Sequence, residues 1–237
     1  MIGCLRYLLH TRPDLAYSVG MASRFMEKPT VMHLQAVKQI MRYLKGTVDM
    51  GLVYTQAGGE EVLVGYTDSD LSGDLVGRRS TGGMAFYLNG NLITWCSQKQ
   101  KTVALSSCES EFMAATAATM QAIWLRNLLS EVTSTKTKVV ALFVDNNYAI
   151  ALMKNPIFHG RSKHIDTRYH FIKECIERGQ IERREREFKS QWWRSSDRAH
   201  ARRVFCSYLF CVCLPMRRQL FISGLCLVNA AGISSLC

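Results

Sequence analysis

The sequence lacks the features of a secreted or membrane protein. Its first residues, M-I-G-C-L-R-Y-L-L-H-T-R-P, contain too short an apolar stretch for a signal peptide and no small-residue cleavage site. Four of the nine cysteines are scattered in neither disulfide nor zinc spacing, which is typical of a reducing compartment. The apolar runs in 204–237 are too short, or too diluted by Ser, Gly and Asn, to predict a membrane span. We therefore favour an intracellular protein, in the cytoplasm or nucleus, over one with a membrane partner.

Negative charge is also scarce. The 237 residues include 19 Asp and Glu against 30 Lys and Arg, which gives a formal net charge of +11 at pH 7. This excess favours a polyanionic partner such as nucleic acid, because each Lys or Arg that faces a phosphate adds salt-sensitive affinity. It is equally compatible with a surface charge that only keeps the protein soluble. The hydrophobic content of 48% indicates a folded globular chain rather than a disordered one.

The pattern of apolar residues divides the chain into three parts. Residues 1–58 contain two apolar stripes at helical spacing, one on each side of Pro29, and show no third helix to cover them. The stretch T-Q-A-G-G-E-E at 55–61 is typical of a linker. Residues 61–182 predict an α/β domain. In 183–237 the pattern fails, because a basic stretch leads into an apolar, Cys-rich ending without amphipathic period, so we expect an irregular tail.

Residues 61–182 predict a mixed sheet with flanking helices. The predicted strands are 62–67, 84–88, 92–95, 102–105 and 139–144, and the predicted helices are 106–129, 146–153 and 166–177. Asn89-Gly90-Asn91 supplies the left-handed residues that a hairpin turn favours. Ser106 and Glu109 have the spacing of a helix capping box. Strands in hairpin order, followed by helix, strand and helix, predict an α/β fold whose parallel strand joins by a crossover.

Acidic side chains follow two of the predicted strands and open the first predicted helix of this domain. Asp68 ends the run V-L-V-G-Y-T-D, Asp145 ends V-V-A-L-F-V-D, and Glu109 and Glu111 fall in the first turn of the helix. Carboxylates that are brought together raise one another's pKa, and divalent cations would offset that repulsion. Mg²⁺ binds a few carboxylates together with waters and phosphate oxygens. The same residues also fit ordinary capping of turns and helices.

Five motifs follow one another along residues 61–182. They are Y-T-D-S-D-L-S-G-D, S-T-G-G-M-A-F-Y-L, I-T-W-C-S-Q-K-Q-K-T-V-A-L-S-S-C-E-S-E-F-M-A-A, V-D-N-N-Y-A-I and R-S-K-H-I-D-T-R-Y-H-F-I-K-E. In this order and at these spacings they resemble the ribonuclease H domain of copia-type retrotransposon polyproteins. Residues 1–58 resemble the end of the reverse transcriptase of the same polyprotein, its thumb or connection helices. The Y-x-D-D metal strand of the polymerase is absent from the sequence, so we expect no polymerase activity.

The resemblance implies a ribonuclease H-like fold and two-metal hydrolysis of the RNA strand of an RNA–DNA hybrid. The family's first metal-binding Asp falls on Asp68, its Glu on Glu111 and its next Asp on Asp145, so these three are the expected catalytic residues and metal ligands. The expected cofactor is Mg²⁺ (or Mn²⁺), with no small-molecule cofactor. Three neighbouring acids are expected to cap or solvate loops instead, namely Asp70, Asp74 and Glu109.

The sequence departs from the family after residue 182. The family continues into a T-x-x-Q-x-A-D-I-L-T-K motif whose Asp is the fourth carboxylate, whereas this chain reads F-K-S-Q-W-W-R-S-S-D-R-A-H-A-R-R. The abrupt loss of resemblance indicates a reading-frame change near 183–195. Asp197 lies in a segment with no helical apolar stripe that would place it beside the other three acids. We therefore expect a tail that is disordered or frame-shifted and a nuclease with three of four carboxylates.

Three interpretations of function remain open from the sequence. The first is a ribonuclease H-like module with weak or absent activity. The second is a non-catalytic remnant that at most binds nucleic acid through its charge. The third is a membrane-tethered protein that uses residues 204–237, which predicts detergent-dependent solubility.

Candidate contacts to an RNA–DNA hybrid are basic and polar residues near the motifs. They are Arg78, Arg79, Lys99, Lys101, Lys163 and His164, with Gln98 and Gln100 next to the first two lysines. Each is equally compatible with an ordinary solvated surface position. On the long predicted helix, Phe112, Met113 and Trp124 are expected in the core.

Overall fold

The computed structural model describes residues 1–56, 61–74, 77–135, 138–144 and 163–185. These residues form two compact units that separate between Tyr54 and Thr55. Asp145, the predicted helix at 146–153 and nearly all of 183–237 lie outside the described residues.

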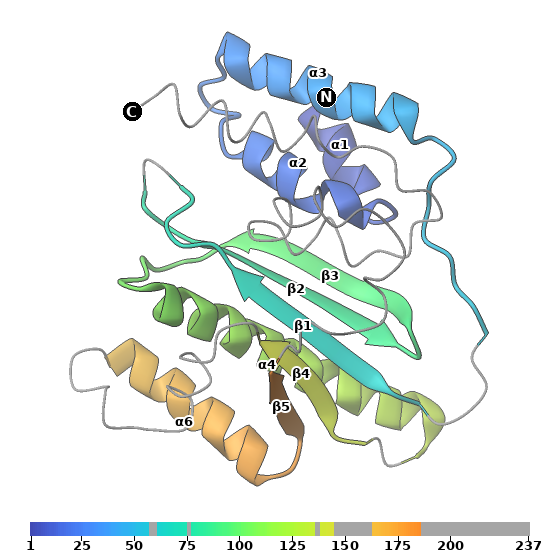
Figure 1. Ribbon diagram of the computed structural model, residues 1–237, viewed down its shortest axis with the longest axis vertical. Helices are drawn as coiled ribbons and strands as arrows, with labels where there is room; N and C mark the ends of the chain where they lie inside the picture. The colour runs from blue at the N-terminus through green and yellow to red at the C-terminus, as the bar shows by residue number, and fades with distance from the viewer. Residues whose placement is uncertain (57–60, 75–76, 136–137, 145–162, 186–237) are drawn as a thin grey trace. The chain divides into compact units, whose positions relative to one another are not determined.

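The N-terminal unit consists of short helices around a small apolar core (Figure 1). Its helices are α1 (Ile2–Leu8), η1 (Pro13–Leu15), α2 (Ala16–Ser23) and α3 (Val31–Gly46). The buried core residues are Leu5, Leu15, Val19, Val37 and Ile40. The expectation that no third helix covers the two stripes is wrong, because α1 contributes Leu5, which is 2% exposed. A helix of 7 residues is too short to show an apolar period in sequence.

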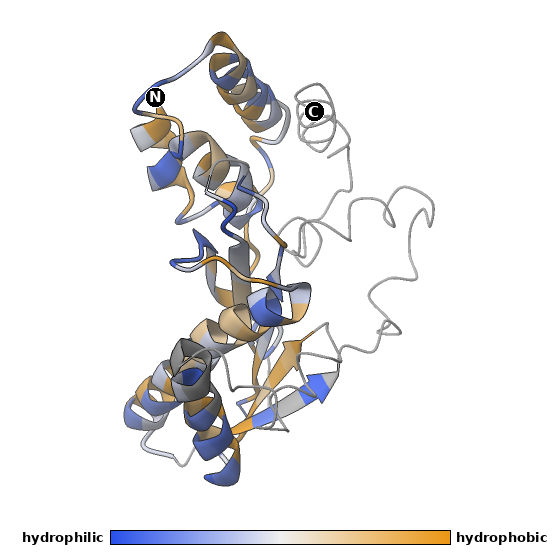
Figure 2. Ribbon diagram, turned by 90° about the vertical axis from the view of Figure 1, so that its left-hand side faces the viewer, coloured by the Kyte–Doolittle hydropathy of each residue, from blue (hydrophilic) through white to orange (hydrophobic). Residues whose placement is uncertain are grey.

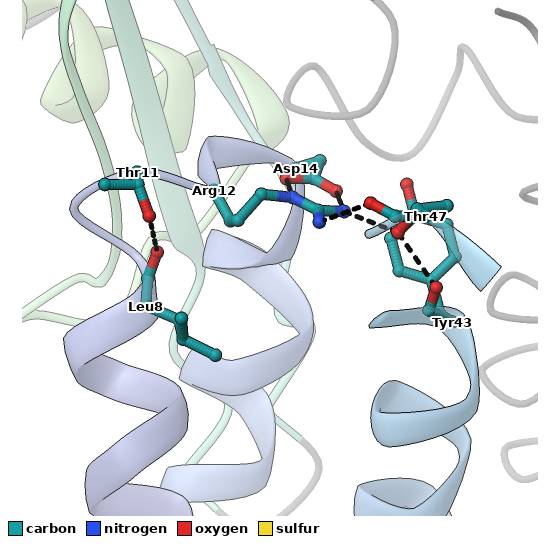
Figure 3. Close-up of polar contacts among 6 residues, drawn as sticks. All are labelled: Leu8, Thr11, Arg12, Asp14, Tyr43 and Thr47. Atoms are coloured by element: carbon teal, nitrogen blue, oxygen red, sulfur yellow. Dashed lines mark hydrogen bonds and ion pairs between the residues drawn. The ribbon is translucent and has the colours of Figure 1, made fainter. Parts of the chain in front are cut away.

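A buried ion pair ties the turn before α2 to the end of α3 (Figure 3). Arg12 Nε and Nη2 donate to the two carboxylate oxygens of Asp14 at 3.0 and 2.7 Å. The same guanidinium donates to the carbonyl oxygen and to Oγ1 of Thr47 at 2.9 and 2.7 Å. Thr47 Oγ1 in turn donates to the carbonyl oxygen of Tyr43. Arg12 and Asp14 are 7% and 5% exposed, so these bonds replace the water that burial removes.

The second unit contains a five-stranded sheet of order β3-β2-β1-β4-β5 (Figure 1). The strands are β1 (Leu63–Ser69), β2 (Thr81–Leu88), β3 (Asn91–Lys99), β4 (Val140–Val144) and β5 (Ile181–Glu185). β1, β2 and β3 are antiparallel neighbours, whereas β4 runs parallel to β1 and β5 runs parallel to β4. The predicted mixed α/β sheet is confirmed, and β1 is its central strand.

The hairpin of β2 and β3 turns at Asn89 and Gly90. Both residues have positive φ, 49° and 80°, which is the conformation that two-residue hairpin turns require. Asn89 Oδ1 also accepts a hydrogen bond from the backbone N–H of Val62 at 2.8 Å, next to the start of β1. The side chain that permits the turn therefore also helps to join it to the central strand.

Close packing surrounds β1. Leu63, Gly65 and Thr67 alternate as its buried residues, as a strand with one core face requires. A Cβ atom at Gly65 would lie 2.5 Å from Phe86 Cε1 and 2.9 Å from Leu142 Cδ1. Only hydrogen in place of a side chain leaves room for these two neighbours, so the sheet closes tightly around the strand that ends at Asp68 and Ser69.

Helices α4 (Ser107–Thr133) and α6 (Lys163–Glu177) share one core with the sheet. On α4 this core takes Phe112, Ala115, Ala118, Ala122 and Leu125, at helical spacing. The prediction of Phe112 and Met113 as buried is confirmed at 0% and 4% exposure. The prediction for Trp124 is wrong, because its side chain is 57% exposed while small residues fill the buried face around it.

The segment at 102–105 is not a strand, so that prediction is also wrong. β3 ends at Lys99, and α4 begins at Ser107. Leu105 is 86% exposed, and its backbone N–H donates to Glu109 Oε2 at 2.8 Å. The short apolar run V-A-L therefore belongs to the connection that leads into α4, where a side chain satisfies its backbone.

β5 extends the sheet beyond the end of the apolar pattern. Gly179, with φ of 62°, follows α6, and Ile181 then pairs with Val140. Figure 2 shows β4 as hydrophobic and β5 as mostly hydrophilic. Ile181 is 3% exposed, whereas Glu182 and Arg184 are exposed. Ile181 therefore anchors this charged strand in the core, and its pairing with β4 adds it to the sheet.

Candidate functional site

Asp68 and Glu111 meet at the end of β1. The backbone N–H of Ser69 donates to Asp68 Oδ1 at 2.7 Å and to Glu111 Oε1 at 3.3 Å. The two carboxylates come from different elements, Asp68 from β1 and Glu111 from the first turns of α4. Glu111 is 7% exposed, so little water solvates its charge. The structure thus brings together two of the three acids that the sequence predicts as catalytic residues.

The thiol of Cys108 lies in the negative potential at the start of α4. Its pKa is raised, first by burial and then by the charges of Glu111 and Glu109. Negative charge disfavours the thiolate for the same reason that it favours a cation. The electrostatic environment beside Glu111 is therefore suited to positive charge.

Glu109 has a structural partner of its own. Ser106 Oγ accepts a hydrogen bond from the Glu109 N–H at 3.1 Å, which makes Ser106 the N-cap of α4 as expected. Glu109 Oε2 accepts from the N–H of Leu105 at 2.8 Å, one residue before the donor that a capping box would use. Glu109 therefore fixes the entry to α4, in agreement with the capping role that the sequence indicates.

Asp70 and Asp74 organise the connection between β1 and β2. Asp70 Oδ1 accepts from the N–H of Thr81 at 2.5 Å, and Asp74 Oδ2 accepts from the N–H of Gly77 at 2.9 Å. Asp74 Oδ2 also forms an ion pair with Lys99 Nζ at 2.5 Å. Both aspartates therefore act as loop anchors, as expected of these neighbours of Asp68.

Exposed basic residues flank the end of the sheet where Asp68 lies. Ser69 pairs with Gly82 at the start of β2, and Gly82 pairs with Gln98 at the end of β3. Arg78 and Arg79 precede that start of β2, Lys101 follows that end of β3, and all three are exposed. Lys99 differs, because it is partly buried and paired with Asp74. The side chains of Lys163 and His164, like Asp145, lie outside the described residues.

Gln100 occupies a place that the sequence does not reveal. The sequence predicts it only as a contact to a hybrid. Its Nε2 donates to Ser69 Oγ at 3.1 Å and to the carbonyl oxygen of Ser110 at 2.8 Å. These partners follow Asp68 and precede Glu111 in the chain. Such a link between distant segments leaves no pattern in a single sequence.

The donor chemistry of Asp68 and Glu111 fits Mg²⁺ or Mn²⁺. Carboxylate oxygens are hard ligands, and Mg²⁺ commonly takes one or two of them together with waters and phosphate oxygens. Among the described residues, no group of three or more His, Cys, Asp and Glu side chains gathers as a metal site. Within the described part, then, the two carboxylates at Ser69 make up the candidate ligand set. None of the helices described here combines the length and apolar character that a membrane crossing needs.

Comparison with known proteins places the chain among transposon polyproteins. It is 44% identical over 177 residues, 74% of its length, to the retrovirus-related Pol polyprotein from transposon TNT 1-94 of Nicotiana tabacum. The chain belongs to the copia-type Pol polyproteins of transposons. It is also 50% identical over 125 residues to secreted RxLR effector protein 161 of Plasmopara viticola, of which it covers 87%. No protein-family model matches it.

This Pol polyprotein segment spans 13% of the TNT 1-94 relative. Its strand order, with three antiparallel strands followed by two parallel ones, is that of the ribonuclease H-like fold that the resemblance implies. The solved structure of LC11-RNase H1, isolated from compost, is similar with a TM-score of 0.38 at 13% identity, over 55% of this chain and 87% of that one.

Proposed function

We propose that the second unit is a retrotransposon-derived ribonuclease H-like module. Its ancestral reaction is hydrolysis of the RNA strand of an RNA–DNA hybrid, and its present activity is weak or absent. The observation that carries the proposal is the convergence of Asp68 and Glu111 on the N–H of Ser69. Two carboxylates that share one donor repel each other, and a divalent cation would offset that repulsion, so their arrangement supports a metal site.

Each part of the site has an assigned role in the proposal. Asp68 and Glu111 hold the divalent ion, Mg²⁺ or Mn²⁺, with Asp145 as the third ligand. Bound by these carboxylates, divalent ions would supply activation of a water and stabilisation of the leaving oxygen in phosphodiester cleavage. The exposed Arg78, Arg79 and Lys101 meet phosphates of the nucleic acid, which position it without reading its sequence.

The proposed weakness of catalysis follows from the sequence after residue 182. The A-D-x-x-T-K motif that supplies the family's fourth carboxylate is absent from the chain. With one ligand fewer, a two-metal site holds its ions less tightly and orients the attacking water less well. We therefore expect this chain to bind a divalent ion but to catalyse hydrolysis weakly or not at all.

The test is cleavage of an end-labelled RNA–DNA hybrid in Mg²⁺ by the full chain and by Asp68→Asn. We expect little or no cleavage above that of Asp68→Asn. Efficient cleavage that Asp68→Asn abolishes would overturn the proposed impairment and assign an active nuclease. The exposed Asp49→Asn serves as a matched control for the loss of one negative charge.

A second candidate function is charge-driven nucleic-acid binding without a metal. The exposed Arg78, Arg79 and Lys101 favour it. It predicts little preference for a hybrid over a DNA duplex, a strong salt dependence with both, and no effect of chelators. The ribonuclease H-like module predicts instead that divalent ions strengthen binding to the hybrid. In Asp68→Asn, divalent ions should then have no effect on this binding.

A further inference from the structure

We propose that Gln100 is a positioning residue that sets the separation of Asp68 and Glu111 and thereby the affinity of the site for a divalent cation. This inference rests on the proposed function of that pair as metal ligands. The side-chain amide of Gln100 lies between the two segments that carry the carboxylates.

The contacts of Gln100 reach β1, α4 and the segment just before β2. Its Nε2 donates to Ser69 Oγ in β1 at 3.1 Å and to the Ser110 carbonyl oxygen in α4 at 2.8 Å. Its backbone N–H donates to the carbonyl oxygen of Ser80 at 2.8 Å, which fixes the main chain just beyond β3. One amide group therefore holds the residue after Asp68 and the residue before Glu111 at a fixed spacing.

Ser69 passes this constraint to the carboxylates. Its N–H donates to both Asp68 Oδ1 and Glu111 Oε1, so a shift of Ser69 would displace both acceptors. Ser69 Oγ donates to the Asp70 carbonyl oxygen at 3.0 Å, which leaves its lone pairs available to Gln100 Nε2. A chain of hydrogen bonds thus leads from Gln100 to the two candidate ligands without direct contact with them.

The arrangement is not optimised for stability. Gln100 Oε1 is buried and accepts no hydrogen bond from any residue that the structure describes. A buried carbonyl oxygen without a donor costs stability, which an apolar side chain of the same size would avoid. The amide therefore contributes something that packing alone does not require, and the position of the two carboxylates is what its donors control.

The adjacent backbone leaves room for this amide. Gly82 of β2 pairs with Ser69, and a Cβ atom there would lie 3.3 Å from Ala114 Cβ and 3.6 Å from Gln100 Nε2. The missing side chain at Gly82 allows α4 to approach closely, and with it the Ser110 carbonyl oxygen that accepts from Gln100. Without that approach the Ser110 carbonyl oxygen would lie farther from the amide.

Mn²⁺ binding to the full chain, followed by electron paramagnetic resonance, tests the proposal. Gln100→Met keeps the length of the side chain and removes both donors. Gln98→Met makes the same replacement two residues earlier, at an exposed position, and is the matched control. We expect Gln100→Met to bind Mn²⁺ about 10–100-fold more weakly, as is typical for partners that orient ligands, and to change the spectrum of the bound ion. Gln98→Met should match the wild type in both.

The Asp68→Asn variant separates the two hypotheses. If the wild type binds no Mn²⁺ that depends on Asp68, the proposed function and the positioning role are both overturned. If Asp68-dependent binding occurs and Gln100→Met binds with unchanged affinity and spectrum, the positioning role alone is overturned. A lower melting temperature with unchanged Mn²⁺ binding would likewise reduce Gln100 to a folding residue.

Gln100→Asn is a second variant that tests the proposal even where Gln100→Met does not fold. It keeps the amide but is one methylene too short to reach both Ser69 and Ser110. We expect an intermediate loss of Mn²⁺ affinity with a wild-type circular dichroism spectrum. Failure of both Gln100 variants to fold, with Gln98→Met folded, would contradict the proposal.

Discussion

Asp68 and Glu111 accept hydrogen bonds from the same donor, the backbone N–H of Ser69, at 2.7 and 3.3 Å. The like charges oppose each other, and the burial of Glu111 keeps water from screening them fully. Under the proposed function, this repulsion is a cost in stability that a bound divalent cation offsets.

Glu111→Gln should stabilise the metal-free protein. Removal of one charge from the pair relieves the repulsion, which we expect to raise the free energy of unfolding. Mg²⁺ should then raise the melting temperature of the wild type and leave that of Glu111→Gln unchanged. Thermal unfolding with chelator and with excess Mg²⁺ measures both effects. The exposed Glu131→Gln, on the same helix, should behave like the wild type in both conditions.

Lys101 and Lys99 should differ in their effect on nucleic-acid binding. Lys101 is exposed, whereas Lys99 forms an ion pair with Asp74. We expect Lys101→Met to reduce the slope of log affinity against log salt by about 1, the value for one lost phosphate contact. Lys99→Met should change this slope less and lower the melting temperature more, because it leaves Asp74 without its cation. Fluorescence anisotropy of a labelled hybrid across a salt series gives the slopes. Equal slope changes for the two variants would contradict this assignment.

Asp14→Asn should destabilise the N-terminal unit. The substitution leaves the buried Arg12 guanidinium without its counter-ion, and broken buried pairs typically cost about 3–5 kcal/mol. The loss should appear in urea unfolding monitored by circular dichroism. Asp49→Asn removes the same charge at an exposed position and should change stability by less than about 0.5 kcal/mol. A double variant, Arg12→Met with Asp14→Leu, should recover most of the loss, since it buries no unpaired charge.

Cys96 should make stability fall at alkaline pH. Burial raises the pKa of its thiol above the ordinary value of 9.0. Above 9.0 the unfolded chain loses this proton while the folded chain keeps it, so the unfolded state binds fewer protons and stability decreases as pH rises. The slope that this thiol contributes cannot exceed about 1.4 kcal/mol per pH unit. Urea midpoints on either side of pH 9.0, compared between the wild type and Cys96→Ala, measure it. A Cys96→Ala variant with the full wild-type slope would assign the effect to other thiols.

The parts of the fold that follow from sequence are those with a local physical cause. The alternation in β1, the left-handed turn at Asn89 and the Ser106 cap each depend on a few neighbouring residues. The segment at 102–105 was open to misassignment because three apolar residues cannot distinguish a strand from a connection. β5 is held by its pairing with β4, which no local pattern encodes.

The candidate site divides in the same way. The motifs predict Asp68 and Glu111 as site residues. Their positions at the end of a strand and the start of a helix allow the two side chains to lie close together. The link through Gln100 joins segments that lie 31 and 10 residues away from it. A hydrogen bond between one amide and two distant serines imposes no period and no composition on the sequence. The link exists only in the three-dimensional arrangement of these segments.

The parallel pairing of β1 with β4 has a consequence for the order of folding. β1, β2 and β3 are neighbours in sequence and can pair as soon as they are synthesised. Val64 pairs on its other side with Ala141, so one edge of the central strand stays bare until α4 and β4 have emerged. An unpaired edge is a template for association with other chains. A chain that stopped before β4 would expose that edge permanently. We therefore expect the edge of β1 to favour aggregation until the crossover through α4 has delivered β4.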